Sequence, residues 1–245
     1  MRGVASDRLM IRTPMNFEAT LEQLFGNLVS GDRIAARALV NDLYDSGISA
    51  ETVSRDLFWP ALEMVHTLHR NDQITILAHN YATRLLRMLV DQAQSRYTQK
   101  ARRNRKICLF CGANEPEELA GQLVADLCEA DGYDLMFAGS GVANDEILAE
   151  VGQHEPDVLL LFASTNRDAP NIRMLIDTVR EVNACPRMQI VVGGGIFNRA
   201  PGLAEEIGAD LSATSPSDLL EKLIEDKDTR SSRARVVKLR TRAAA

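Results

Sequence analysis

The sequence predicts an α/β fold, in which an N-terminal four- to five-helix bundle precedes a five-stranded, doubly wound parallel sheet. Apolar residues recur at helical spacing through residues 16–95. Short apolar runs then alternate with amphipathic segments through residues 107–226, which is typical of βαβ units. With 245 residues, 45% of them hydrophobic, the chain can build sizeable cores. A basic linker at 96–106 and a basic tail at 227–245 complete the predicted organisation.

The helical half begins after a lead-in of sixteen residues without clear periodicity. Its first helix shows one apolar face (Leu21, Leu24, Phe25 and Leu28) and should end at Gly31-Asp32. A second helix should end at Gly47, and Ser49 is placed to cap a third. Pro60 must start, kink or break the helix that contains it, because proline lacks the backbone N–H. A last helix follows after residue 72, and together these segments predict an antiparallel bundle.

The second half predicts five strands and the helices between them. The expected strands are Ile107–Cys111, Leu135–Ala138, Val158–Ala163, Ile190–Val192 and Leu211–Ala213, with helices near 115–130, 142–153, 170–183, 201–207 and 216–225. This order fits a flavodoxin-like or Rossmann-like sheet covered on both faces. Ligands of such sheets bind beyond the carboxyl ends of the strands. Residues at these ends are therefore candidate binding residues: Gly112, Ser164, Thr165, Gly193, Gly194 and Gly195.

Charge is strongly segregated along the chain. Residues 107–226 hold 22 acidic and 6 basic residues, so this region would repel the phosphates of a nucleic acid. The linker carries 6 basic residues and no acidic one, and the tail carries 7 basic residues and one acidic one. These two segments could be solvated connectors, or they could contact nucleic acid or an acidic partner. Direct nucleic-acid binding is therefore expected only through them.

The remaining composition favours a cytoplasmic protein without catalytic machinery. No apolar run reaches the roughly 18 residues of a membrane span, and the N-terminus lacks a signal-peptide pattern. Cys108 and Cys111 should face opposite sides of one strand, which predicts two structural thiols rather than half of a zinc site.

No catalytic constellation emerges, so the chain is not expected to be an enzyme. Ser164 has no partner pattern for a nucleophilic triad. Glu63, His66 and His69 share a helix face, but a carboxylate-bridged metal site needs ligands from several facing helices. Only His79 adds an imidazole from another part of the bundle, so no metal site is predicted.

The order of bundle and sheet resembles cobalamin-binding modules, which occur in methionine synthase, in corrinoid carriers of methyltransferase systems and in light-sensing repressors. The resemblance covers about residues 16–226 and is strongest at 121–135 (GQLVADLCEADGYDL), 169–181 (APNIRMLIDTVRE) and 191–210. It implies a cobalamin held between bundle and sheet. The glycine pair of these modules is kept as Gly193-Gly194.

Two departures bear on that ligand. The first-turn motif Asp-x-His-x-x-Gly falls on residues 115–120, so Glu117 stands where the resemblance implies a cobalt-binding histidine, and Glu115 stands where it implies an aspartate. A glutamate is a harder donor than imidazole. On the bundle side, the Trp and Glu-His positions over the corrin fall on Leu68, Ala78 and His79. Phe162, in place of a serine, would also crowd the channel for the nucleotide tail.

These departures lead to three hypotheses. The first is a non-catalytic sensor or regulatory protein for signal transduction or transcription regulation. It would hold base-on cobalamin, another tetrapyrrole or no cofactor, would act on a protein partner and could form a homo-oligomer. The alternative is a corrinoid carrier of a methyltransferase system. The third is a haem or bilin sensor that uses His79 or a cysteine.

Overall fold

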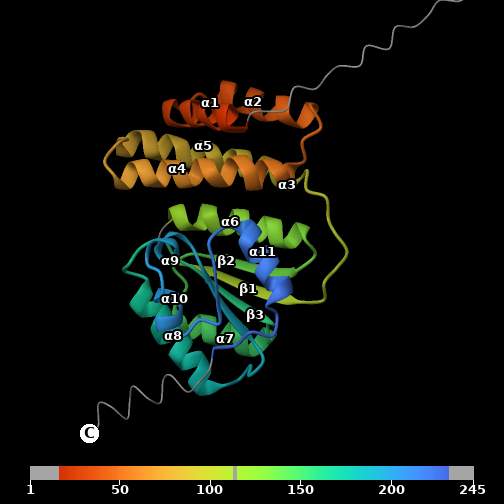
Figure 1. Cartoon of the computed structure of the whole chain (residues 1–245), viewed down its shortest axis with the longest axis vertical. Coiled ribbons are helices and arrows are strands. Elements are labelled where there is room, and N and C mark those ends of the chain that lie inside the picture. Colours follow the sequence, from red (N-terminus) through yellow and green to blue (C-terminus); the bar gives the residue numbers. More distant parts are fainter. Residues whose placement is uncertain (1–16, 113–114, 232–245) are drawn as a thin grey trace, which may run out of the picture.

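The structure, a computed structural model, describes residues 17–112 and 115–231, and its first half is the predicted bundle (Figure 1). The elements of the bundle are α1 (Phe17–Ser30), α2 (Arg33–Asp45), α3 (Ala50–Val53), the π-helical turn η1 (Ser54–Phe58), α4 (Trp59–Arg70) and α5 (Ile76–Gln94). The predicted cap is present, because Ser49 Oγ accepts from the Thr52 N–H. The lead-in up to residue 16 and the tail beyond residue 231 lie outside the described residues.

Pro60 does not break its helix but follows a widened turn. Residues 50–70 form one continuous helical run, within which Ser54–Phe58 is π-helical and the Trp59 N–H donates to the Ser54 carbonyl. Pro60 has no N–H to offer the preceding turn, and a π turn is a common way to absorb such a defect. This turn lies directly before Trp59, which lines the pocket described below.

The second half is a five-stranded, all-parallel sheet in the order β2-β1-β3-β4-β5, which confirms the predicted fold class. Its strands are β1 (Lys106–Cys111), β2 (Asp134–Gly139), β3 (Val158–Phe162), β4 (Gln189–Gly193) and β5 (Leu211–Ala213). Its helices are α6 (Glu115–Ala130), α7 (Asn144–His154), α8 (Ala169–Val182), α9 (Gly195–Arg199), α10 (Leu203–Glu206) and α11 (Pro216–Glu225). The short helix α9 is an addition to the elements predicted.

Each face of the sheet has its own core. One face packs against α6 and α11 and is continuous with the core of the bundle, whereas the other packs against α7, α8, α9 and α10. Cys111 packs against the first core and Cys108 lies in the second, and both are free thiols. The alternation predicted for the two cysteines is therefore confirmed.

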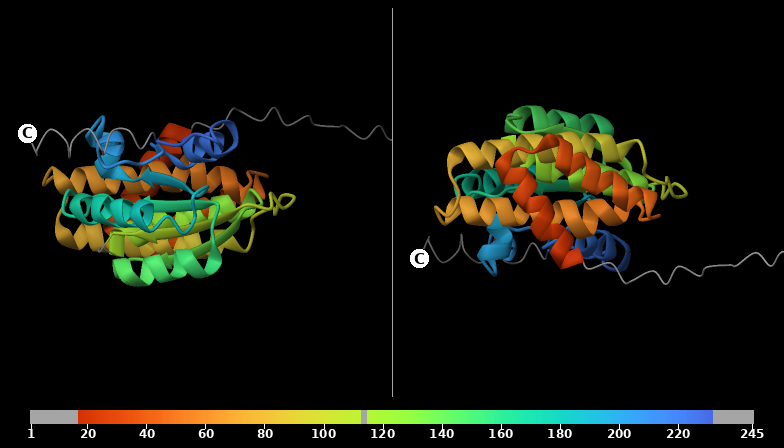
Figure 2. Two further views of the ribbon diagram at one scale, coloured as in Figure 1. Left: turned by 90° about the horizontal axis from the view of Figure 1, so that it is seen from below. Right: turned by 90° about the horizontal axis from the view of Figure 1, so that it is seen from above.

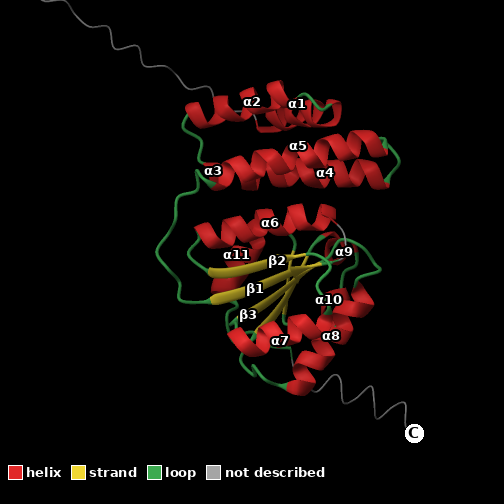
Figure 3. Ribbon diagram, turned by 180° about the vertical axis from the view of Figure 1, so that it is seen from behind, coloured by secondary structure: helices red, strands yellow, loops and turns green. Residues whose placement is uncertain are grey.

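The elements form stacked layers. From one end to the other these are α1 with α2, α4 with α5, then α6, the sheet, and α7 with α8 (Figures 1 and 3). Seen along the long axis, α7 lies at one side of the molecule and α11 at the opposite side (Figure 2). Because α6 lies between the bundle and the sheet, it is the main contact surface for both.

The basic linker 96–106 is docked rather than free. Lys100 and Arg103 both form ion pairs with Asp131, a buried carboxylate of the sheet half, and Arg105 donates to Gln189 Oε1. Two of the six basic residues of the linker thus share one carboxylate within the chain. Within residues 17–112 and 115–231, no helix combines the length and apolarity of a membrane span.

Candidate functional site

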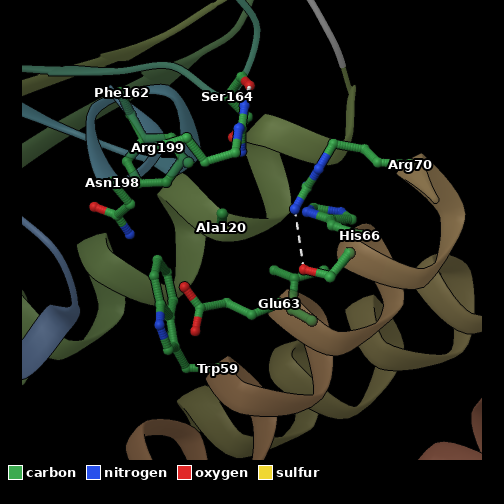
Figure 4. A pocket seen from close by; sticks show the side chains of 12 residues that line it. Trp59, Glu63, His66, Arg70, Ala120, Phe162, Ser164, Asn198 and Arg199 are labelled. Carbon is green, nitrogen blue, oxygen red and sulfur yellow. Dashed lines mark hydrogen bonds between the residues drawn. The ribbon is translucent and has the colours of Figure 1, made fainter. Parts of the chain in front are cut away.

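A pocket of about 250 Å³ lies where the bundle meets the carboxyl ends of the strands (Figure 4). Helix α4 supplies one wall, and residues after β3 and β4 supply the other, with one residue from α6 between them. The lining residues are Trp59, Leu62, Glu63, His66, Thr67, Arg70, Ala120, Phe162, Ser164, Gly195, Asn198 and Arg199. This is the edge of the sheet where ligands of doubly wound folds bind.

The sheet-side wall depends on close backbone packing. Gly194 has φ of +102°, and a Cβ built on it would lie 2.3 Å from the Ala163 carbonyl oxygen. Only glycine tolerates this conformation at so short a distance. The tight turn brings Gly195 and α9 beside Ser164, so that Arg199 donates to the Ser164 carbonyl.

Two aromatic rings close the floor of the pocket. The Trp59 and Phe162 ring centroids are 6.3 Å apart with an interplanar angle of 87°, an edge-to-face contact between bundle and sheet. Both side chains are buried. Trp59 Nε1 is buried and finds no hydrogen-bond partner among the described residues. Phe162 therefore fills part of the space between the bundle and the end of β3.

The charged side chains of the pocket are Glu63, Arg70 and Arg199. Burial lowers the pKa of Arg70, and repulsion from Arg199 lowers it further, while Glu63 acts in the opposite direction. Burial raises the pKa of Glu63 and Arg70 partly offsets this effect. The Trp59 indole also acts to lower the pKa of Glu63, although Trp59 Nε1 makes no hydrogen bond of good geometry. Cations therefore outnumber carboxylates here.

His66 adds a neutral imidazole. Burial, followed by repulsion from His79, Arg70, His69 and Arg199, lowers its pKa to about 3. Its Nε2 atom is buried and has no hydrogen-bond partner within the described residues. The His69 and His79 ring centroids are 4.2 Å apart, and those of His66 and His79 are 5.8 Å apart. Among the described residues, no group of His, Cys, Asp and Glu has the geometry to hold a metal ion.

The structure brings only some of the predicted site residues into the pocket. Ser164 and Gly195 line it, and Gly194 shapes it. Gly112 donates to the Phe162 carbonyl, Thr165 donates to Asp168, and Gly193 pairs with Phe162 in the sheet, so these three support the edge without lining the pocket.

The bundle-side predictions fall beside the pocket. Leu68 is a half-buried residue of α4, and His79 is buried on α5, but neither is among the lining residues. Glu115 and Glu117 belong to the first turn of α6, and their side chains lie outside the described part of the structure. The neighbouring Glu118 accepts from Ser140 and lies 3.7 Å from Arg87 of α5, which links the sheet half to the bundle.

Sequence reasoning missed Trp59 and Arg70 on the bundle side of the pocket and Arg199 on the sheet side. No motif marks these residues, but one signal was present: Trp59 is the single tryptophan of the chain and precedes a helical proline. Its position along α4 is also one helical turn from Glu63 and two from His66, which puts the three on one face.

Comparison with known proteins identifies the family. The B12 binding domain family matches residues 105–223, and a second B12 binding domain family matches residues 20–94. Both halves of the chain are thus covered. The chain belongs to the B12-binding domain family.

Individual proteins that are similar to this chain include corrinoid proteins. Monomethylamine corrinoid protein 1 of Methanosarcina acetivorans is 24% identical over 111 residues, which are 44% of this chain and 50% of that protein. The chain thus matches half the length of this relative. The structure of the Methanosarcina barkeri monomethylamine corrinoid protein has a TM-score of 0.66 and 16% identity, with 86% of this chain and all of that one covered. A methanol:cobalamin methyltransferase complex of M. barkeri aligns more loosely, with a TM-score of 0.47, 13% identity and coverage of 87% and 82%.

The pocket fits a B12-type cofactor in its chemistry but not in its size. Two buried polar atoms without partners, Trp59 Nε1 and His66 Nε2, are suited to a ligand that brings hydrogen-bonding groups. A volume of about 250 Å³ is, however, below the roughly 300–1,000 Å³ of ordinary small-molecule sites. A corrinoid is larger than most such ligands. To accept one, the bundle and the edge of the sheet have to move apart.

Proposed function

We propose that this protein is a corrinoid carrier of a methyltransferase system, which holds its cofactor between α4 and the carboxyl edge of the sheet. The observation that carries the proposal is the pocket at this edge, closed by the bundle and lined by polar atoms without partners. The names of the relatives support a carrier rather than a sensor. They give no support to signal transduction or transcription regulation. The expected partner is therefore a methyltransferase protein.

In this proposal the chain supplies binding and positioning, and the corrinoid supplies a cobalt centre that can accept and release methyl groups. The tight turn at Gly194 would hold the sheet-side wall against which the ligand lies, and Trp59 would cover its apolar surface. His66 stays neutral well below pH 7, so its lone pair is available as an acceptor. The bundle, 16–95, and the sheet, 107–226, would act as two units joined by the linker 96–106.

The cofactor should keep its own base on cobalt, because Glu117 stands at the histidine position of the family motif. Electron paramagnetic resonance of the cob(II)alamin-loaded protein tests this point. With uniformly ¹⁵N-labelled protein and unlabelled cofactor, the nitrogen splitting should remain the triplet of ¹⁴N. A doublet would mean that a nitrogen of the protein has replaced the base.

A binding experiment tests the proposal as a whole. Purified protein would be mixed with cob(II)alamin, methylcobalamin and adenosylcobalamin, desalted, and examined by absorption spectroscopy. We expect a corrinoid spectrum that elutes with the protein in near-stoichiometric amount. A protein that remains colourless after all three mixtures is not a corrinoid carrier. A protein coloured only by haem or a bilin would favour the tetrapyrrole sensor instead.

A further inference from the structure

The pocket contains two guanidinium groups that no carboxylate neutralises. Arg70 reaches in from α4 of the bundle, and Arg199 from α9 of the sheet half (Figure 4). Arg70 donates to Thr67 Oγ1 at 3.0 Å, and Arg199 donates to the Ser164 carbonyl oxygen. Among the described residues, neither arginine forms an ion pair. Since a guanidinium has five N–H donors, both retain donors for a ligand.

Arg199 has no ion pair although the region around it is acidic, and the same holds for Arg167 and Arg187 among the described residues. Residues 107–226 have 22 acidic residues against 6 basic ones, so acidic partners are abundant. Two other arginines of the sheet half use them: Arg180 pairs with Asp210 at 2.9 Å, and Arg173 lies within 4.0 Å of Asp177 and Glu206. Arg199 instead lies close enough to Arg70 for the repulsion between the two cations to lower the pKa of Arg70. Both residues are exposed, so solvent screens part of this repulsion, and an anion bound between them would relieve the rest.

The single carboxylate in the pocket offsets this charge only partly. Burial raises the pKa of Glu63 and so favours its neutral form. Glu63 is therefore a weaker counter-ion for Arg70. His66 contributes no charge near neutral pH, because its pKa is lowered to about 3. A negatively charged ligand would therefore be attracted to this pocket. The net negative charge of residues 107–226 as a whole would repel the same ligand.

The uncharged groups of the pocket suit an oxyanion as well. Ser164 has a hydroxyl group beside Arg199, and Asn198 has a side-chain amide at the same wall. The two guanidinium forks come from different elements on opposite walls. A planar carboxylate is matched by one fork, whereas a tetrahedral phosphoryl group projects oxygens toward both.

We propose that the pocket between α4 and α9 is a phosphoryl-binding site, in which Arg70 and Arg199 clamp one phosphate group between the bundle and the sheet. The phosphate could be free, as inorganic phosphate or a phosphomonoester, or it could be the phosphodiester in the nucleotide tail of a cobalamin. Both sources present the same chemistry. In both cases the bound group ties the two halves of the chain together at this edge.

The site can be tested on cofactor-free protein, with Trp59 as the probe. Trp59 is the single tryptophan of the sequence and lines the same pocket, so its fluorescence reports on the site alone. Inorganic phosphate would be titrated at constant ionic strength, with calorimetry as a second measurement that does not depend on fluorescence. We expect saturable binding, and an increase of the Kd of about tenfold or more in Arg70→Gln and in Arg199→Gln, as for the loss of one charge-assisted pair.

A matched control is Arg55→Gln. Arg55 pairs with Asp56 on the surface of the bundle, outside the pocket, so the Kd for phosphate should not change. Thermal melts establish that all three variants fold. The proposal is overturned if phosphate does not bind to the wild type, or if Arg70→Gln and Arg199→Gln bind it as well as Arg55→Gln does. Acetate binding as tightly as phosphate would identify a carboxylate site instead.

A second arm distinguishes the two sources of phosphate. Cobinamide lacks the nucleotide tail and its phosphodiester, whereas cobalamin has both. If the tail supplies the group, Arg199→Gln weakens cobalamin binding but not cobinamide binding, and inorganic phosphate competes only with cobalamin. If free phosphate is the ligand, cobalamin and cobinamide respond alike. Because the phosphate titration needs no corrinoid, failure of the corrinoid proposal would leave its result interpretable.

Discussion

The two ends of the contact between bundle and sheet differ in packing and in charge. At the Arg70 end of α4, bundle and sheet enclose a pocket with two arginines and buried polar atoms without partners. At the opposite end, near η1 and the end of α5, the same two halves are in close contact. There Gln94 of α5 donates to Asp126 Oδ1 of α6 at 3.2 Å, and Tyr97 of the linker donates to Ser54 Oγ of the bundle at 2.6 Å. We call these the hollow end and the closed end.

The closed end is acidic where the hollow end is basic. Asp126 is only 4% exposed, its Oδ2 atom has no hydrogen-bond partner among the described residues, and Glu129 and Asp91 are nearby. Burial, followed by repulsion from these two carboxylates, raises the pKa of Asp126 to about 7. The closed end can therefore anchor the two halves while the hollow end opens for a ligand. This contrast between the two ends makes testable predictions.

The largest effect is expected at the hollow end, from Gly194→Ala. The new methyl group would approach the Ala163 carbonyl at a φ of +102°, which should cost about 3 to 5 kcal/mol of unfolding free energy. Urea unfolding would measure the loss. Gly152→Ala is the control, because a Cβ there meets nothing within 4 Å in the helical segment α7, and it should be neutral or slightly stabilising. Equal stability of the two variants would contradict the close packing of this wall.

At the closed end, Asp126→Asn should change how stability depends on pH. The pKa of Asp126 is about 7 in the folded state against 3.8 as the unperturbed value, so the native state binds more protons between these values. Wild-type stability should therefore fall as pH rises through this window and level off above pH 7. Relative to Asp126→Asn, the wild type should lose about 2 to 3 kcal/mol between pH 5 and 8. Parallel pH profiles of the two proteins would show that Asp126 is not perturbed.

Tyr97→Phe should have a smaller effect at the same end. It removes the donor to Ser54, whose side chain is fully buried, and should cost about 1 to 2 kcal/mol. Tyr81→Phe serves as the control, because Tyr81 is 46% exposed and should tolerate the loss of its hydroxyl group. Thermal or chemical unfolding of both variants compares them. If Tyr97→Phe is as stable as Tyr81→Phe, the closed end is less tightly held than the structure implies.

The smallest observable change, an NMR titration that should be absent, is expected for His66 at the hollow end. With its pKa lowered from 6.5 to about 3, His66 should stay neutral between pH 5 and 8 in the folded protein. The stability linked to this group is present above pH 6.5 and declines as pH falls from there toward 3. NMR of the imidazole should show no titration near pH 6.5, whereas an ordinary midpoint would mean that the pocket is more hydrated than described.

The elements that the sequence predicts well are those with a regular pattern of apolar residues. The β3 run of Val158–Phe162 is apolar at every position because it is buried on both faces, and the Cys108 and Cys111 alternation follows from strand geometry. The strand-end rule also named Ser164 and Gly195, which line the pocket. Helix α9 was not predicted, because five residues after three glycines carry too little periodicity.

The site residues on the bundle side could not be predicted from a sequence pattern. Which residues of α4 face the sheet depends on how that helix lies across α6 and the end of β3, and this angle is a property of tertiary packing. No motif marks Arg70, and Trp59 stands out only as the single tryptophan, whereas the family alignment pointed to Leu68 and His79, which are not among the lining residues. Arg199 is likewise placed by the Gly194 turn rather than by any local pattern.

The most direct test of the central claim is hydrogen exchange of the corrinoid-loaded and the free protein. If the cofactor binds at the hollow end, amides of residues 59–70 and 193–199 should become protected on loading. Residues 91–97 and 122–128, at the closed end, should exchange as before. A bound corrinoid that protects neither segment of the hollow end, or that protects the closed end instead, would contradict the account.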